Sequence, residues 1–225
     1  MKTQIRKIVM SFGADLCGFA NIDRFENTPV GYNPKDIYAN CKSVISYAVA
    51  LPKGLAKVNP RLIYGHYNSM SCQTADFIAF QSAKKIESEF NCVVVPIPSD
   101  SPYEYWDKDN MEGKGLLSMK HAAVLAGLGS IGKSSLFLTK QFGNMVTLGA
   151  MLTDLDLASD ELSENLCNDK CHKCMDVCPV TSINNGIVTQ KMCRENTYGT
   201  TARGFDTVDC NKCRVSCPLN NAYIS

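Results

Sequence analysis

Cysteine carries the most evident chemistry in this sequence, because its twelve copies are unevenly placed. Four are scattered over the first hundred residues, and the other eight fall between residues 167 and 217. The clustered residues form two C-x2-C-x3-C-P runs with additional cysteines upstream of each. Runs of this form are typical of bacterial proteins with two 4Fe-4S clusters, in which the last cysteine of a run binds the other cluster. The sequence therefore predicts a ferredoxin-like, electron-transferring region.

The ligands can be assigned because the last cysteine of each run binds the cluster of the other run. Proline after the last cysteine ends each loop without needing an amide donor. One zinc ion would need only four thiolates, and it would leave the two Cys-Pro endings unexplained. The first spacing is three residues instead of two, which we interpret as a loop insertion. One cluster is predicted on Cys167, Cys171, Cys174 and Cys217, and the other on Cys178, Cys193, Cys210 and Cys213.

The remaining cysteines and the nearby histidine receive simpler interpretations. His172 lies between two predicted ligands, but eight cysteines already suffice, so we expect it to be an exposed loop residue. The scattered cysteines follow no ligand spacing and are expected to be free buried thiols. They are Cys17, Cys41, Cys72 and Cys92.

A glycine-rich loop, AGLGSIGKSS at residues 126–135, is the second chemical feature. It satisfies both the P-loop and the dinucleotide-binding patterns, but each of these must follow a strand and open a helix. Here residues 116–126 are expected to be helical, and only a short apolar stretch follows. Two interpretations stay open. The backbone amides, with Lys133 and Ser134, contact a large ligand, or the loop is a structural turn.

The elements that must position these residues mix helices and strands. Apolar periodicity predicts helices over residues 3–12, 74–90 and 116–126, and buried strands over residues 44–51 and 92–98. Phe77, Ile78, Phe80 and Ile86 give the second helix its period, and Asn91 ends it. Apolar stretches at 136–138 and 145–152 flank a turn at 142–144. The acidic stretch 154–164 then marks a boundary near residue 160, which predicts an α+β domain over 1–160 and a cysteine-rich domain over 161–225.

Composition bounds the partners and the compartment. The 225 residues include 23 basic and 22 acidic side chains, a net charge of +1, and 45% are hydrophobic. This balance gives no electrostatic reason to expect a nucleic acid or a membrane surface. No apolar run approaches the length of a membrane span, and the amino terminus has neither an export signal nor twin arginines. We therefore expect a cytoplasmic protein, whose reduced cysteines favour metal over disulfides.

Together the motifs resemble a known family. The stretch AGLGSIGKSSLFLTKQFGNMVTLGAMLTDLDL, the cysteine array and DCNKCRVSCPLN are similar to the core of epoxyqueuosine reductases, cobalamin-dependent iron–sulfur enzymes related to reductive dehalogenases. The resemblance implies a nitroreductase-like cobalamin-binding domain followed by a small ferredoxin-like domain. No D-x-H-x-x-G motif is present, which is consistent with cobalamin bound without a histidine ligand. The implied cofactor-binding residues are Gly127, Leu128, Gly129, Ser130, Ile131, Gly132, Lys133 and Ser134.

The chain departs from that family at the proton donor. The position of the expected aspartate falls on Gly113, with Glu112 beside it as a substitute or as a surface carboxylate. Tyr103 and Tyr105, in PYEYWD, are further candidates, although such a segment is more typical of a surface loop. No catalytic residue is therefore assigned. The tRNA-engaging extension of the family is also missing, so no nucleic-acid partner is expected.

The favoured hypothesis is an iron–sulfur oxidoreductase. It would take low-potential electrons from a donor such as ferredoxin or flavodoxin and pass them through both clusters to bound cobalamin, reducing a small molecule or the corrinoid itself. Two alternatives remain. The chain is an electron-transfer protein without its own substrate, or the same fold binds FMN in place of cobalamin.

Overall fold

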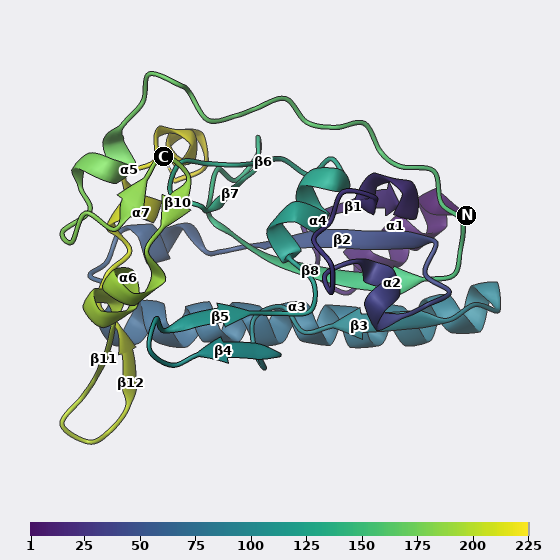
Figure 1. The fold of residues 1–225 in the computed structure, drawn as a ribbon, viewed down its shortest axis with the longest axis horizontal. Coiled ribbons are helices and arrows are strands. Elements are labelled where there is room, and N and C mark those ends of the chain that lie inside the picture. Colours follow the sequence, from purple (N-terminus) through teal and green to yellow (C-terminus); the bar gives the residue numbers. More distant parts are fainter. Residues whose placement is uncertain (225) are drawn as a thin grey trace.

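A four-stranded antiparallel sheet organises the first part of the chain (Figure 1). The computed structural model describes residues 1–224. The strands lie in the order β1-β2-β8-β3, with β1 at Leu16–Asn21, β2 at Ser43–Ala50, β8 at Val146–Thr153 and β3 at Val94–Ile97. The two long central strands are buried almost throughout, as their continuous apolar runs predict. The expected strands at 44–51 and 92–98 are thus confirmed within a few residues.

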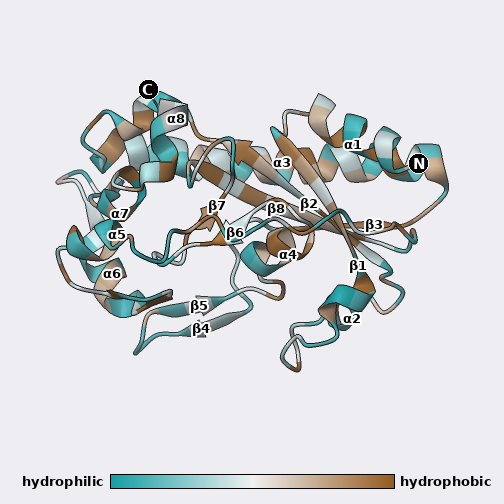
Figure 2. Ribbon diagram, turned by 90° about the horizontal axis from the view of Figure 1, so that it is seen from above, coloured by the Kyte–Doolittle hydropathy of each residue, from teal (hydrophilic) through white to brown (hydrophobic). Residues whose placement is uncertain are grey.

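Helices cover both faces of this sheet (Figure 2). On one face lie α1 (Lys2–Ser11) and α3 (Arg61–Phe90), which pack on a core containing Phe19, Ile45 and Met151. On the other face α4 (Met119–Leu125) packs through its alanines on Val44, Ala150 and Leu152 with their neighbours. The mixed helix-and-sheet fold class is confirmed.

The long helix α3 differs most from its prediction. It has 30 residues and starts at Arg61, thirteen residues before the expected start, and it ends at Asn91, which has a left-handed backbone. Ile78 and Ile86 are buried as expected, whereas Phe77 and Phe80 are 55% and 54% exposed. The buried face is instead completed by small residues such as Ala75 and Ala79. An apolar period counts large side chains and overlooks such small ones.

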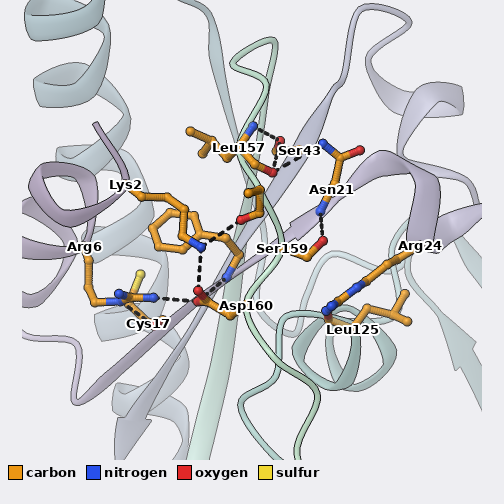
Figure 3. Close-up of polar contacts among 12 residues, drawn as sticks. Lys2, Arg6, Cys17, Asn21, Arg24, Ser43, Leu125, Leu157, Ser159 and Asp160 are labelled. Carbon is orange, nitrogen blue, oxygen red and sulfur yellow. Dashed lines mark hydrogen bonds and ion pairs between the residues drawn. The ribbon is translucent and has the colours of Figure 1, made fainter.

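After β8 the chain recrosses the molecule as an extended arm, residues 154–166 (Figure 1). Figure 3 shows how its middle is fixed. The Asp160 carboxylate accepts a hydrogen bond from the Phe19 amide at 3.1 Å and pairs with Lys2 at 2.7 Å and with Arg6. The Ser159 hydroxyl accepts a hydrogen bond from the Asn21 backbone amide at 2.8 Å. The predicted boundary region is thus an ordered strap, and the division into domains 1–160 and 161–225 stays a prediction.

The cysteine-rich region is made of short elements. Its only buried residues among those described are Ser182, Ile183, Thr207, Asn211 and Asn220. None of the helices within residues 1–224 has the length and apolar character to cross a membrane. The elements are α5 (Lys173–Asp176), β9 (Ile183–Asn184), β10 (Ile187–Val188), α6 (Gln190–Thr197), β11 (Tyr198–Thr200), β12 (Asp206–Val208), α7 (Lys212–Val215) and α8 (Asn221–Ile224).

Smaller elements complete the first part. They are α2 (Pro34–Ile37), the hairpin of β4 (Tyr105–Asp107) and β5 (Glu112–Lys114), and the hairpin of β6 (Ser130–Ile131) and β7 (Phe137–Leu138).

Candidate functional site

The first set of cysteines is brought together from both ends of the region. Helices α5 and α7 pack against each other, which brings the chain after α7 back to the first cysteine run. Burial raises the pKa of the Cys174 thiol, and the nearby Cys167 and Cys171 raise it further. Burial likewise raises the pKa of Cys217, with Cys167, Cys171 and Cys174 all contributing in the same direction. Cys217 therefore lies among the three cysteines with which the sequence groups it.

The second set gathers around Cys213. Burial raises the pKa of Cys213 to about 11, the Arg214 guanidinium opposes this, and Cys193 and Cys210 raise it. Cys178 differs: burial acts to raise its pKa, but hydrogen bonds from the Ser182 hydroxyl, at 3.4 Å, and from backbone amides lower it overall. Three of the four predicted ligands of this cluster thus lie near one another.

The donor set suits cubane clusters. No three His, Cys, Asp or Glu side chains within residues 1–224 converge closely enough for a single metal ion. Thiolates around a cubane are spaced more widely, because each binds a different iron. Asn211 lies between Cys210 and Cys213 in the sequence, and its side-chain Nδ2 is buried without a hydrogen-bond partner. The sulfur atoms of a cluster accept hydrogen bonds from such amides. The residues present fit two clusters, whose binding stays a prediction. His172 is exposed, as expected.

The glycine-rich loop packs against the protein itself. A Cβ at Gly127, where φ is +76°, would lie 2.0 Å from the Glu161 carbonyl oxygen. A Cβ at Gly129 would lie 1.8 Å from the Leu138 carbonyl oxygen, and one at Gly132 would lie 2.9 Å from the Leu138 side chain. Packing against backbone oxygens therefore requires glycine at 127 and 129, whereas at 132 the Leu138 side chain can move aside. The loop follows helix α4 and enters the β6–β7 hairpin, so the nucleotide-binding patterns lack the structural context that they need.

Lys133 ties this loop to the first cysteine run. Its ammonium group donates to the backbone carbonyls of Asn168, Asp169 and Cys171, at 3.4 Å from the first and 3.1 Å from the last. The Ser130 hydroxyl accepts a hydrogen bond from the Leu166 backbone amide at 3.0 Å. The loop thus positions the predicted cluster ligands. Direct contact between residues 127–134 and a cofactor stays a prediction.

A cavity of about 670 Å³ lies where the two parts of the chain meet. Its walls come from segments 97–104 and 113–120, residues 135–137 and the start of β8. Tyr32, in the loop before α2, and two residues of α3, Asn68 and Cys72, complete this side. The cysteine-rich region contributes Tyr198 and Arg214. Arg214 directly follows Cys213, so the cavity adjoins the second set of cysteines. The wall includes Ser135 but none of residues 127–134.

The candidate proton donors separate in this geometry. Tyr103 lines the cavity, and its hydroxyl donates to Asp100 at 3.1 Å. Burial raises its pKa. Glu112 lies outside the cavity wall, on a shallow hollow of the β4–β5 hairpin, and pairs with Lys114 at 3.4 Å. Gly113, at the position of the expected aspartate, does line the cavity, and Tyr105 lies on the same outer hollow as Glu112.

An aromatic cage around Arg194 joins this wall to the second set of cysteines. The guanidinium lies 5.7 Å from the Tyr103 ring, 5.1 Å from that of Trp106 and 5.7 Å from that of Tyr198. Arg194 directly follows Cys193. The sequence favoured a surface loop for PYEYWD, and the structure makes Tyr103 part of a cavity wall while Trp106 stays 48% exposed.

Several wall residues give no signal in the sequence. Lys120, Asn144 and Arg214 belong to separate segments, and although Asn144 and Arg214 lie within the stretches that resemble the family, the sequence assigns none of the three a role. Cys72 also lies in the wall and is only partly buried, as is Cys92, whereas Cys17 and Cys41 are buried as predicted. The expectation of four buried thiols is thus right for two of them.

Comparisons with known proteins find relatives and solved structures that match nearly the whole chain. No family model matches. Epoxyqueuosine reductase of Bacillus anthracis is 25% identical over 98% of this chain and 64% of its own length. The solved epoxyqueuosine reductase of Streptococcus thermophilus superposes with a TM-score of 0.70 at 22% identity, covering 98% of this chain and 66% of that one. The chain is similar to epoxyqueuosine reductases over nearly its whole length.

The likeness extends to a second group and has a definite limit. A catabolic reductive dehalogenase shares the fold with a TM-score of 0.72 at 16% identity, covering 96% of this epoxyqueuosine reductase-like chain and 31% of the dehalogenase. This chain spans just under two thirds of the curated relative described above. One epoxyqueuosine reductase structure contains a tRNA stem loop. That complex counts against the expectation of no nucleic-acid partner, which rested on the overall charge and on the missing extension.

Proposed function

We propose that this chain is an iron–sulfur oxidoreductase that delivers low-potential electrons through two 4Fe-4S clusters to cobalamin held in the cavity. The observation that carries the proposal is the joint construction of the cavity wall. Residues of the helix-and-sheet part form most of it, and Arg214 and Tyr198 of the cysteine-rich region complete it. Electrons leaving the second cluster would therefore enter the cavity without crossing bulk solvent.

The lining suits a corrinoid, whose rim carries amide groups. Such groups need both donors and acceptors, and the wall supplies them from Asn68, Ser135 and Thr147, among others. No histidine lines the cavity among the described residues, in agreement with binding without a histidine ligand. When bound, cobalamin supplies a redox-active cobalt that reduces the substrate. The segments at 135–137 and 146–148 would hold it.

Tyr103 is the proton donor that this arrangement favours over Glu112 and Tyr105. Its hydroxyl lies in the cavity wall, its proton is directed to Asp100, and burial keeps the phenol neutral. Asp100 and Arg194 orient it, the latter from 3.5 Å. A neutral phenol whose hydroxyl turns from Asp100 towards the cavity can release its proton to a substrate, while the Arg194 cation stabilises the phenolate that results. The physiological electron donor is proposed to be a ferredoxin or flavodoxin.

The test is an anaerobic titration of the cluster-loaded protein with cobalamin, followed by visible absorbance and cobalt EPR. We expect saturable binding with a change to the base-off spectrum. Leu136→Trp, which fills the cavity from its partly buried wall, should weaken binding at least about tenfold. The matched control Leu162→Trp, on the exposed arm, should bind normally. Absence of cobalamin binding, with iron and sulfide filling both sites, would reject cobalamin and direct the titration to FMN.

A further inference from the structure

The cavity wall next to Cys213 contains an arginine without an anionic partner. Arg214 forms no ion pair with any carboxylate in the part of the chain that the structure describes. One nitrogen of its guanidinium donates to the Asn144 backbone carbonyl. Its remaining N–H groups have no hydrogen-bond acceptor within residues 1–224. A guanidinium in a cavity wall with free donors is suited to bind a carboxylate or phosphate.

Asn144 places an unpaired donor in the same wall. The residue is 1% exposed. Its backbone N–H donates to Asn220 Oδ1 at 2.9 Å, and its side-chain Oδ1 accepts from Asn220 Nδ2 at 3.0 Å. This pair of hydrogen bonds with Asn220 determines which side-chain atom of Asn144 is the oxygen and which is the nitrogen. The nitrogen, Nδ2, has no hydrogen-bond partner among the described residues. A buried amide donor without an acceptor needs a partner that the described residues do not supply, such as a water molecule or an atom of a ligand.

The other charges of the wall fit the same interpretation. Lys120 is a second cation without an ion pair among the described residues, and it donates to the Ser135 carbonyl at 2.9 Å and hydroxyl at 3.0 Å. The wall's carboxylates, Asp100 and Glu104, come from a different segment, and Asp100 is already bonded to Tyr103. No carboxylate therefore competes for the arginine.

We infer that Arg214 and Asn144 form an anion subsite in the cavity, which binds a carboxylate or phosphate group of the molecule that is reduced or of the cofactor. The inference rests on the proposed function only in taking the cavity as the ligand site. Because Arg214 directly follows the predicted ligand Cys213, an anion bound there would partly neutralise the positive charge next to the second cluster.

The test uses the cluster-loaded protein without cobalamin, so it is independent of cobalamin binding and of activity. Calorimetric titrations with inorganic phosphate, acetate and the uncharged acetamide are compared at constant ionic strength. We expect saturable binding of phosphate or acetate and none of acetamide, and the stronger anion identifies the class. The midpoint potential of the second cluster should fall when the anion is bound.

Variants locate the bound anion. Arg214→Gln should weaken anion binding at least tenfold, and Arg203→Gln, the same change on the exposed β11–β12 turn, should not. Asn144→Asp keeps the acceptor for Asn220 and replaces the free donor with a carboxylate oxygen, so it should abolish binding even where Arg214→Gln fails to fold. Equal binding by Asn144→Asp and the natural chain, or no binding of either anion by the natural chain, would overturn the inference.

Discussion

The helix-and-sheet part and the cysteine-rich region are stabilised in different ways. The first has a continuous buried core on both faces of its sheet. In the second, Ile183 is the one buried apolar residue among those described, and Figure 2 shows that hydrophilic residues prevail around α5 and α6. A chain segment with so little apolar burial needs another source of stability, and metal binding supplies it in many small domains. We therefore expect clusters to stabilise the second part, whereas packing stabilises the first.

Removal of the clusters is expected to have the largest effect. Chelation, or Cys217→Ser, should abolish the structure of the cysteine-rich region because metal binding contributes to its folding free energy. Hydrogen exchange measured by mass spectrometry should show loss of protection across residues 167–217 and retained protection in β2 and β8. Cys92→Ser, which changes a cysteine outside the predicted ligand sets, is the control. Simultaneous loss of protection in both parts would contradict the comparison.

A packing change in the sheet should destabilise the helix-and-sheet part and leave the cysteine-rich region unaffected. A Cβ at Gly149 would lie 2.2 Å from the Tyr47 hydroxyl, so Gly149→Ala should lower the free energy of unfolding of the helix-and-sheet part by roughly 1–3 kcal/mol. Gly54→Ala, where an added Cβ meets nothing within 4 Å, is the matched control. Denaturant titration gives the stability and iron analysis gives the cluster content, which should not change. Iron loss in Gly149→Ala with unchanged stability would refute this division.

The connection between the two parts can be weakened separately. Lys133→Met removes the ammonium group that binds three carbonyls around the first cysteine run. We expect a loss of about 1–2 kcal/mol in local stability, measured as faster hydrogen exchange over residues 166–174 and slower cluster reconstitution. Lys170→Met removes a similar charge from the same loop, where its ammonium group makes no hydrogen bond or ion pair within residues 1–224. Equal effects of the two changes would show that charge, and not the three bonds, matters.

The smallest effect concerns pH. Burial raises the pKa of Tyr47, whose hydroxyl donates to the Ala75 carbonyl. The folded state therefore keeps this proton above pH of about 10, where an unfolded tyrosine loses it. Its contribution is fully present below that pH and is lost as the pH rises, by up to about 1.4 kcal/mol per pH unit. Tyr47→Phe should flatten the alkaline decline of the unfolding free energy, and the exposed Tyr67→Phe should not. Parallel declines in all three proteins would exclude this cause.

The sequence predicted best what depends on local spacing. The cysteine intervals predicted that Cys217 lies with the first run, and the apolar patterns predicted β2, β3 and α4. The sequence predicted less well the burial of side chains that depends on how distant segments pack together. Phe77 was expected to be buried because no local pattern shows that Ala75 and Ala79 complete the inner face of α3.

The cavity wall was beyond sequence reasoning for the same reason. Lys120, Asn144 and Arg214 become neighbours of one cavity only after the extended arm brings the cysteine-rich region back across the molecule. The glycines of residues 127–132 were recognised, but the contacts that require them come from Leu138 and from Glu161 on the arm. Their type was informative, and their packing partners were not predictable.

The central claim is that the cavity receives electrons from the second cluster. The most direct measurement mixes anaerobically reduced, cluster-loaded protein with one equivalent of oxidised cobalamin and follows the cluster and cobalt EPR signals together. We expect cobalt to be reduced as the cluster signal disappears in the natural chain and in Leu162→Trp, and the exchange to be at least about tenfold slower in Leu136→Trp. Equal rates in all three proteins, or reduced clusters that persist beside oxidised cobalamin, would contradict it.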